Sequence, residues 1–431
     1  MKFLIRGGKK LLGGVVVPGA KNAATKMMVA SLLTAEPVVL KNFPRIGDTE
    51  ITRELCELLG AKVDFLEKNI CQLQTLEIKN HQALTLSRKN RIPILALGPL
   101  LSRVGKAEVP ALGGDKIGHR PVDLHVRALT LMGAEIEVTE NSYRATAPNG
   151  LRGANIKLDF PSVGATENII LAAVLAKGTT VISNAAVEPE ILDLIKLLQK
   201  MGAIIELGAD RVITICGVLK LHGATHTILP DRNEVVSFAC LAVATDGKIF
   251  VRGAKQDDLI TFLNALRKGG GDYTVDDDGI WFFRVGELKA TEIETDSHPG
   301  FMTDWQQPFM VLLTQANGVS FIHETIYEDR LGYTKDLNKM GAEITVFPKC
   351  LGELRCRFNG MGFNHSAVIT GPTRLKGAEL EVRDLRSGMV DIIAALVAPG
   401  ESVISNIEEI ERGYEDIEGK LRGLGAEIVR V

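Results

Sequence analysis

A short pattern of apolar and polar positions recurs six times along the chain. An apolar run with helical spacing ends in Gly, usually followed by Ala, and an alternating apolar–polar run typical of a strand comes next. The fourth copy is degenerate, with three consecutive glycines. Because a helix that turns directly into a strand commonly ends in a left-handed residue, we predict that conformation for these glycines. They are Gly60, Gly133, Gly202, Gly270, Gly341 and Gly425, at intervals of 73, 69, 68, 71 and 84 residues.

The third copy shows what else each repeat contains. The pattern predicts an apolar helix over 164–176, a strand over 179–184, a helix over 191–201 opened by Glu188-Pro189-Glu190, and a strand over 204–207. The sixth copy predicts the same order, with a helix over 389–397, a strand over 402–407 and a helix over 414–424. The fourth and fifth show it around 235–244 and 309–315.

A period near 70 residues is longer than that of the common solenoids, so each repeat is expected to be a small αβ subdomain. Six repeats make two halves of three, and a cleft between two halves is a natural place for an active site. The nearly all-apolar helices are expected to lie inside, with the sheets outside them.

Composition and charge narrow the class of protein. The 431 residues are 45% hydrophobic and 24% charged, and the net charge of −3 argues against a nucleic-acid scaffold. The 43 glycines against 22 aromatic residues indicate many turns and caps. The N-terminus has no signal-peptide core, and the most apolar stretch, 392–399, is too short to cross a membrane. We therefore expect a cytoplasmic protein without a membrane partner.

The cysteines and histidines show no recognisable ligand spacing. No C-x-x-C pair occurs, and without a secretory signal a disulfide framework is not expected. The common nucleotide-binding and H-E-x-x-H motifs are missing as well. The expectation is therefore no metal and no cofactor. The residues concerned are Cys56, Cys71, Cys216, Cys240, Cys350 and Cys356, and His81, His119, His125, His222, His226, His298, His323 and His365.

Three segments combine glycine with charged residues next to apolar helices or in loops, where charged side chains are less expected. In 18–24, Lys21 and Asn22 enter an apolar helix, either as an anion site at its N-terminus or as a cap with a solvent-facing Lys. Segment 113–125 is either a catalytic lid with an acid and an Arg or an exposed polar hairpin. In 298–306, Asp304 precedes an apolar helix, so a plain N-cap is the alternative to a catalytic role.

Four arginines stand at junctions of the repeats, namely Arg91, Arg330, Arg386 and Arg412. A single arginine of this kind is usually part of a surface ion pair. Several at similar places in repeats favour a shared anionic ligand, because Arg binds phosphate and carboxylate bidentately.

Several motifs together resemble the UDP-N-acetylglucosamine 1-carboxyvinyltransferases, a family of enolpyruvyl transferases. The resemblance covers the chain from end to end and is carried by Gly19–Ala23, Ala96–Leu100, Gly118–His125, Ser162–Thr166, Thr303-Asp304, Glu328–Arg330 and Arg412–Tyr414. The wider family, which includes the shikimate-pathway enolpyruvyl transferases, implies an α/β fold: a two-domain inside-out α/β barrel of six βαβαββ repeats, three per domain. The implied domains are 21–229, which carries a mobile catalytic loop at about 111–121, and 1–20 plus 230–431, with the site in the cleft between them.

The resemblance also implies a reaction. The enolpyruvyl group of phosphoenolpyruvate passes to the 3-hydroxyl of UDP-N-acetylglucosamine and phosphate leaves, without metal or cofactor, in the first committed step of peptidoglycan precursor synthesis. Catalytic roles would belong to Asp115, Asp304 and Lys21. Phosphoenolpyruvate would meet Lys21, Asn22, Arg120, Arg386 and Arg412, and the UDP-sugar would meet Arg91, Arg120, Pro121, Val122, Asp123, Leu124, Ser162, Val163, Gly164, Asp304, Ile326 and Arg330.

Two positions depart from the family pattern. Asp115 stands where most members carry a loop cysteine, so a carboxyl would protonate C3 of phosphoenolpyruvate, with Lys21 as the alternative acid. Since a carboxylate is a weaker nucleophile than a thiolate, we expect no covalent inactivation by fosfomycin, and an adduct on Asp115 would contradict this. Gly47 stands where many relatives carry Lys, and Arg45 is a possible substitute.

Two other functions stay open. The chain could transfer the same group to another acceptor such as shikimate 3-phosphate, although Asn22 and the run Arg120–Leu124 favour a UDP-sugar. The chain could instead be a catalytically inactive paralogue that binds UDP-sugars as a sensor and is not an enzyme. The departures at Asp115 and Gly47 favour this second hypothesis.

Overall fold

The computed structural model describes residues 1–86, 90–111, 122–354 and 356–431. Within them the chain forms two compact units, each with its own hydrophobic core. Unit 1 comprises residues 1–18 and 230–431, and unit 2 comprises residues 19–111 and 122–229. The chain therefore enters unit 1, builds unit 2 and then returns to complete unit 1.

Each unit contains three small sheets, and five of the six sheets have four strands. In the four-stranded sheets one pair of strands is parallel and the other pairings are antiparallel. A parallel pair needs a crossover. In three of these five sheets one helix provides it, whereas in the other two the parallel strands lie far apart in sequence. Five of the six repeats are therefore βαβαββ units, each unit contains three repeats, and the mixed α/β architecture expected from the resemblance is confirmed.

In unit 2 the first repeat takes its first strand, β13, from the far end of the unit, and the second has a single bridge, Gln82 with Glu108, in place of that strand. The first comprises β13 (Ala224–Thr227), α1 (Lys21–Ala30), η1 (Ser31–Leu33), β3 (Val38–Lys41), α2 (Gly47–Leu59), β4 (Lys62–Glu67) and β5 (Ile70–Gln74). The second comprises η2 (Ile92–Ala96), α3 (Leu97–Val104), β6 (Lys106–Pro110), α4 (Asp123–Leu131), β7 (Glu135–Val138) and β8 (Ser142–Thr146). The third comprises β9 (Asn155–Lys157), α5 (Val163–Ala173), β10 (Thr179–Ser183), α6 (Pro189–Lys200), β11 (Ile204–Leu207) and β12 (Ile213–Cys216).

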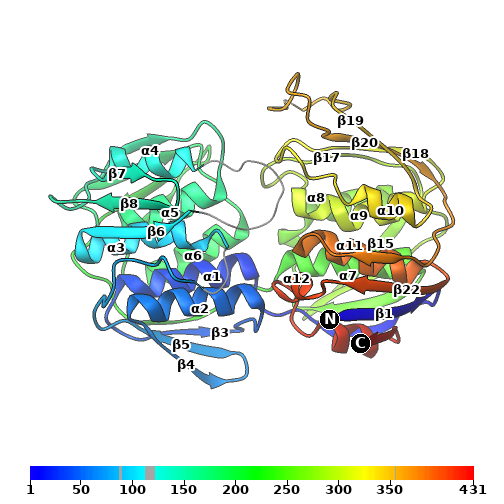
Figure 1. Cartoon of the computed structure of the whole chain (residues 1–431), viewed down its shortest axis with the longest axis horizontal. Coiled ribbons are helices and arrows are strands. Elements are labelled where there is room, and N and C mark those ends of the chain that lie inside the picture. The colour runs from blue at the N-terminus through cyan, green and yellow to red at the C-terminus, as the bar shows by residue number, and fades with distance from the viewer. Residues whose placement is uncertain (87–89, 112–121, 355) are drawn as a thin grey trace. The chain divides into compact units, whose positions relative to one another are not determined.

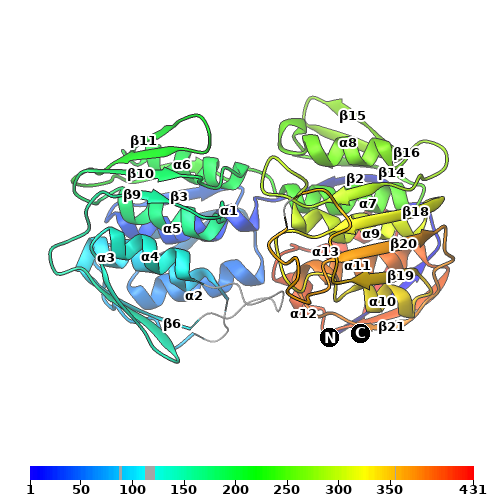
Figure 2. The same ribbon diagram turned by 90° about the horizontal axis from the view of Figure 1, so that it is seen from above.

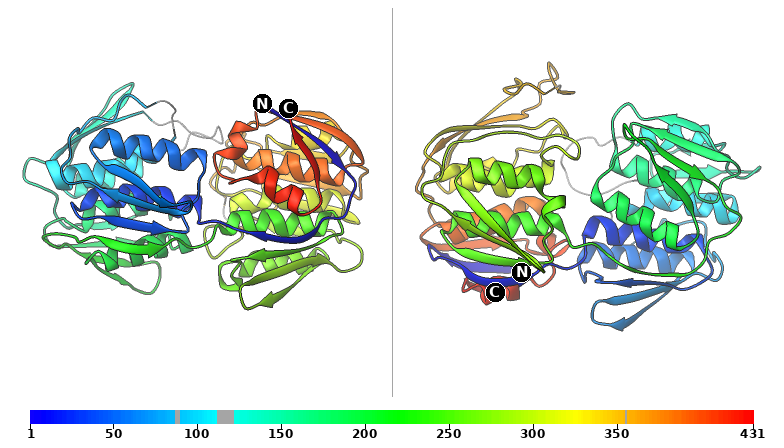
Figure 3. Two further views of the ribbon diagram at one scale, coloured as in Figure 1. Left: turned by 90° about the horizontal axis from the view of Figure 1, so that it is seen from below. Right: turned by 180° about the vertical axis from the view of Figure 1, so that it is seen from behind.

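In unit 1 the two N-terminal strands complete sheets whose other strands come more than two hundred residues later, and β1 pairs with β23 so that the two termini lie side by side (Figure 3). The fourth repeat comprises β2 (Leu12–Val16), α7 (Arg232–Ala244), β14 (Lys248–Arg252), η3 (Gln256–Asp258), α8 (Ile260–Lys268), β15 (Gly271–Asp276) and β16 (Gly279–Arg284). The fifth comprises β17 (Glu292–Glu294), α9 (Thr303–Thr314), β18 (Gly318–His323), α10 (Thr334–Lys339), β19 (Glu343–Phe347) and β20 (Ser366–Gly371). The sixth comprises β21 (Glu379–Glu381), α11 (Leu385–Val397), β22 (Gly400–Ser405), α12 (Glu408–Glu411), α13 (Ile417–Gly423), β23 (Glu427–Arg430) and β1 (Lys2–Gly7).

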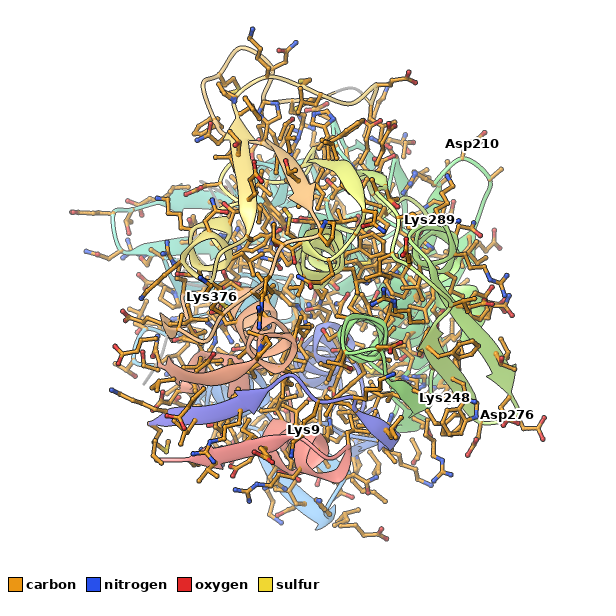
Figure 4. The ribbon with its side chains drawn as sticks, turned by 90° about the vertical axis from the view of Figure 1, so that its right-hand side faces the viewer. Lys9, Asp210, Lys248, Asp276, Lys289 and Lys376 are labelled. Atoms are coloured by element: carbon orange, nitrogen blue, oxygen red, sulfur yellow. The ribbon has the colours of Figure 1, made fainter. Side chains whose placement is uncertain are left out.

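The first helix of each repeat lies inside its unit, as the apolar pattern predicts. All residues of α7 are buried, and α9 and α11 are buried except at one end. These three helices pack against one another within unit 1, with the sheets outside them (Figures 1 and 2). Charged side chains lie on the outer strands instead, as Lys248 on β14 and Asp276 on β15 show in Figure 4.

The six repeat glycines behave as predicted. Each has a positive φ, between 92° and 112°, and each stands between a helix and the strand that follows it. Several boundaries were shifted: the helices predicted over 164–176 and 389–397 span Val163–Ala173 and Leu385–Val397, and the strand predicted over 402–407 spans Gly400–Ser405. The helix predicted over 414–424 begins only at Ile417. Asp416, at φ 47°, takes a left-handed conformation, and its carboxylate accepts a hydrogen bond from the Gly419 amide at 3.2 Å, which starts the helix there.

Candidate active site

In unit 1 the first turns of the three central helices carry charged side chains. Arg232 is the first residue of α7, while Asp304 and Arg386 are the second residues of α9 and α11. A helix N-terminus has unpaired amides and a partial positive charge, so it favours an anion. The sequence folds in this way because each apolar helix needs a polar start, and here that start is ionic.

Asp304 joins two of these helices. Its Oδ1 accepts a hydrogen bond from Nη2 of Arg330 at 2.5 Å, and its Oδ2 lies 3.4 Å from Nε of Arg386. The Arg330 and Arg386 side chains are only 2% and 6% exposed, whereas Asp304 is 18% exposed. The alternatives considered for these residues, a plain N-cap and surface ion pairs, are therefore wrong: the N-cap of α9 is Met302, and both arginines are buried.

Both arginines stay charged in this setting. Burial alone would lower the pKa of Arg386, but Tyr414, Asp304 and Asp231 outweigh it and raise the pKa. The Arg386 Nη1 donates to the Tyr414 hydroxyl at 3.3 Å, and that hydroxyl is 2.8 Å from Oγ of Ser237 on α7. All three central helices are thereby linked through polar groups at or near their first turns.

Glu324 holds the segment that contains Ile326. Its Oε1 accepts the amides of Ile326 and Tyr327 at 2.8 and 3.1 Å, and its Oε2 accepts the Thr303 hydroxyl at 2.8 Å. Burial raises the pKa of Glu324. Sequence reasoning missed this residue, because a lone Glu after a strand gives no signal.

Two further arginines of unit 1 have different surroundings. Arg412 pairs with Glu409 at 2.7 Å and its side chain is 12% exposed. Arg232 is buried, with its Nη1 3.4 Å from Nδ1 of His298 and its guanidinium 5.4 Å from the Trp305 ring. Arg232 was not predicted, although a cation between the cap Asp231 and an apolar helix was a usable signal.

In unit 2, Lys21 is the first residue of α1. Its Nζ lies 2.6 Å from Oδ2 of Asp48, the second residue of α2, and the two side chains are 13% and 5% exposed. A solvent-facing cap is therefore the wrong description of Lys21. Asn22 follows it on the same helix and is half-buried.

Arg91 and a buried histidine lie close to one another in unit 2. Arg91 is the residue before η2. The pKa of His125 is lowered to about 3, mainly because the imidazole is buried and in addition because of the positive charge of Arg91. His125 Nδ1 is 3.1 Å from Nδ2 of Asn168, which also donates to the Ile94 carbonyl at 3.2 Å. The imidazole is therefore neutral and connects α4, α5 and η2.

The start of α5 has a different, uncharged geometry. Ser162 is its N-cap and accepts the Ala165 amide at 3.3 Å, while Val163 and Gly164 are half-buried. A Cβ on Gly164 would lie 3.2 Å from the His125 ring, so the helix end and the imidazole approach closely. On α4, Asp123 is exposed, and Val122 and Leu124 are half-buried.

Not every predicted site residue has a described position. Asp115, Arg120 and Pro121 lie outside the described residues. Gly47 is the first residue of α2, and Arg45, the possible substitute for a lysine there, places its guanidinium 3.7 Å from the Phe65 ring centroid.

The structure also gathers residues that the spacing analysis did not connect. His323, Cys350, Cys356 and His365 each offer a ligand atom, and the four atoms lie within 4.8 Å of one another. The only sequence signal was indirect: the interval of 84 residues after Gly341 exceeds the other four and points to an insertion in that repeat.

A family model described as EPSP synthase (3-phosphoshikimate 1-carboxyvinyltransferase) matches residues 5–421. Three curated relatives carry the name UDP-N-acetylglucosamine 1-carboxyvinyltransferase. That of Protochlamydia amoebophila is 50% identical, covering 98% of this chain and 93% of its own. That of Chlamydia trachomatis serovar D is 48% identical, with coverages of 97% and 96%, and that of Gluconacetobacter diazotrophicus is 43% identical, with 100% and 99%.

Solved structures share the fold at lower sequence identity. The enolpyruvyl transferase NikO from Streptomyces tendae matches with a TM-score of 0.87 at 24% identity, covering 99% of this chain and 98% of its own. EPSP synthase from Acinetobacter baumannii matches with a TM-score of 0.74 at 18% identity and full coverage of both chains. In the part of the chain that the structure describes, no helix is long and apolar enough to cross a membrane.

Proposed function

The chain belongs to the EPSP synthase (3-phosphoshikimate 1-carboxyvinyltransferase) family, and we propose that it transfers the enolpyruvyl group of phosphoenolpyruvate to the 3-hydroxyl of UDP-N-acetylglucosamine. The observation that carries the proposal is the full-length similarity, at 43 to 50% identity, to curated relatives of that name. The reaction is the first committed step of peptidoglycan precursor synthesis.

The chemistry is an addition followed by an elimination. The 3-hydroxyl oxygen attacks C2 of phosphoenolpyruvate while a proton is added at C3, giving a tetrahedral adduct. A proton then leaves C3, the C–O bond to phosphate breaks, and the enol ether and inorganic phosphate remain. The steps need a proton acceptor, a proton donor and cations around the phosphate and carboxylate.

Asp304 is the proposed acceptor for the sugar hydroxyl. It is held by two buried arginines yet keeps 18% of its side chain exposed, so one edge of the carboxylate can face a ligand. Arg386 and Arg412 in unit 1, with Lys21, Asn22 and Arg120, supply positive charge and donors toward phosphoenolpyruvate. A second set of residues is proposed to contact the UDP-sugar: Arg91, Pro121 to Leu124, Ser162 to Gly164, Ile326 and Arg330. Arg120 and Asp304 are proposed to contact it as well.

The proton donor to C3 is assigned to Asp115, with Lys21 as the alternative. An acid of ordinary carboxyl pKa is almost fully ionised at pH 7, so Asp115 must be brought into an apolar setting when substrate binds. The nearby cations Lys116 and Arg120 would oppose that change.

One experiment distinguishes this function from its competitors. Phosphate release from phosphoenolpyruvate is measured with UDP-N-acetylglucosamine or with shikimate 3-phosphate as acceptor. Phosphate release only with the UDP-sugar supports the proposal. Phosphate release only with shikimate 3-phosphate would show that shikimate 3-phosphate is the acceptor. Binding of the UDP-sugar without release from either acceptor would identify a sensor and contradict the proposed enzyme.

A further inference from the structure

The fifth repeat contains a connection that its counterparts lack. Residues 348–365 join β19 to β20, whereas residues 277–278 join β15 to β16 and residues 68–69 join β4 to β5. Figure 1 shows the β19–β20 connection extending beyond the sheet that bears it. An added segment of this length in a small repeat needs its own means of holding a conformation, because it contributes little to the hydrophobic core.

Four side chains with soft or borderline ligand atoms meet at the base of this connection. Cys350, Cys356 and His365 lie on or at the end of it, and His323 ends the neighbouring strand β18, where it pairs with Ser366 of β20. The Cys350 Sγ lies 3.4 Å from Nε2 of His365, and the two imidazole centroids are 5.6 Å apart. All four ligand atoms lie within 4.8 Å of one another.

The other ring nitrogens of the two histidines are already occupied. Nδ1 of His323 is 3.1 Å from Oε2 of Glu294, and Nδ1 of His365 is 2.7 Å from the Phe363 carbonyl. These are the outer partners that commonly fix the orientation of metal-binding imidazoles. They leave the Nε2 atom of each ring free to face the thiols.

One of the four ligand atoms has no hydrogen-bond partner in the described part of the chain. Both histidines are fully buried, and Nε2 of His323 has no hydrogen-bond partner among the described residues. A buried polar atom without a partner is unfavourable, and a bound ion at the site would satisfy it.

We propose that His323, Cys350, Cys356 and His365 bind one structural Zn²⁺. Zinc bound by two thiolates and two imidazoles is tetrahedral, with Zn–S near 2.3 Å and Zn–N of about 2.0–2.1 Å, which separates the ligand atoms by roughly 3.3–3.8 Å. Side-chain movements of about 1 Å bring the present cluster to that geometry. Two thiolates neutralise the charge of the ion, and four protein ligands leave no open position for catalysis.

Backbone contacts fit the same assignment. The Sγ of Cys356 accepts the Phe358 amide at 3.3 Å, so the backbone helps to fix the position of this ligand atom. Glu294, the partner of His323, also accepts the amides of Glu353 and Leu354 at 3.0 and 2.8 Å. The connection is thus folded back over the cluster.

The metal would order the segment that holds Ile326. The Glu324 amide donates to the His365 carbonyl at 2.7 Å, and Nη2 of Arg357 donates to the Ile326 carbonyl at 2.7 Å. Removal of zinc should therefore speed hydrogen exchange at the Ile326 and Tyr327 amides. This consequence is independent of the proposed reaction, since it is read without substrate.

The first test is metal content. The full chain, purified without chelators and without a metal-affinity tag, should contain about one zinc atom per chain by plasma mass spectrometry. A Cys350→Ser, Cys356→Ser double variant should lose at least tenfold of that zinc by loss of two of the four ligands. Cys216→Ser is the matched control, because Cys216 is also a half-buried free thiol but lies on β12, and it should keep the zinc.

The second test needs no variant. Wild-type chain is stripped of metal, refilled with Zn²⁺ and alkylated, and the labelled cysteines are mapped by mass spectrometry. Zinc should slow labelling of Cys350 and Cys356 at least tenfold and leave Cys216 unchanged. Absence of zinc in the purified chain together with no protection on refilling would overturn the site, as would equal zinc in the double variant and the wild type.

Discussion

The two units use one architecture and place different chemistry on it. Both are built from three repeats around buried helices, and in both units charged or polar side chains stand at the start of some of those helices. In unit 1, Asp304 and Arg386 stand at these first turns, and Asp304 contacts both Arg386 and Arg330, which precedes α10. In unit 2, Lys21 at the start of α1 pairs with Asp48 of α2, α5 begins with a serine cap, and a neutral His125 of α4 is linked to Asn168 of α5.

This contrast shows that the shared fold provides equivalent positions at the helix ends, while the residues at those positions decide what each site can do. A helix can begin with a neutral cap or with a cluster of charged side chains. Only a cluster of charged side chains can accept a proton or bind a phosphate. Buried ions cost desolvation energy, so a cluster of three where a serine would suffice indicates a use beyond stability.

Asp304→Asn should lower kcat for phosphate release by about 10²- to 10⁴-fold, because the amide cannot accept the hydroxyl proton. The KM for the UDP-sugar should change much less. Asp257→Asn is the control, an exposed Asp of the same unit, and its kcat should stay within about twofold of wild type. If both variants keep wild-type kcat, unit 1 does not carry the proton acceptor.

In each unit, the pKa of one of the buried glutamates is raised far enough for its titration to be visible in stability. Burial raises the pKa of Glu234 in unit 1 to about 7, and burial raises that of Glu167 in unit 2 to about 7, against an ordinary value of 4.5. A lysine opposes the effect in each case, Lys420 beside Glu234 and Lys26 at 3.9 Å from Glu167.

The folded state therefore binds more protons than the unfolded state between pH 4.5 and about 7. The stability that each group contributes is complete below pH 4.5 and is lost as the pH rises through 7, by about 3 kcal/mol per group. Urea unfolding at pH 5 and pH 8 should show the fall, and Glu167→Gln or Glu234→Gln should each reduce it. Glu67→Gln, on an exposed strand, should leave it unchanged, whereas equal pH slopes in all four proteins would refute the assignment.

The smallest expected difference lies in the helix caps. Ser162→Ala should destabilise by about 1 kcal/mol through the lost bond to the Ala165 amide. Asp384→Ala, at the start of α11, should cost about 2 kcal/mol, because its carboxylate accepts both the Arg386 and Ser387 amides. Denaturant midpoints measure both, and a larger loss from Ser162→Ala than from Asp384→Ala would reverse the contrast between the units.

Much of the fold was predictable because it is repeated. The glycines that end six helices were found from the local pattern alone, and the strand over 204–207 was placed correctly, since helix stops and alternation are local signals. The start of α13 was misplaced because it depends on one left-handed aspartate, which a helical pattern does not reveal.

The site was less predictable than the fold. Asp304 and the arginines stood out as charges beside apolar helices, but their mutual contact joins residues 26 and more positions apart in sequence. Glu324 and the His–Cys cluster were missed for the same reason. Their partners lie on other elements, such as β17, β18 and the β19–β20 connection, which come together only in the folded chain.

Transfer to a UDP-sugar is seen in the product itself. The wild-type chain is incubated with phosphoenolpyruvate and UDP-N-acetylglucosamine, and the nucleotide fraction is examined by mass spectrometry alongside released phosphate. We expect a UDP-N-acetylglucosamine that has gained one carboxyvinyl group, formed in equal amount with phosphate. If UDP-N-acetylglucosamine stays unchanged under conditions in which the chain binds it, the chain does not catalyse this transfer.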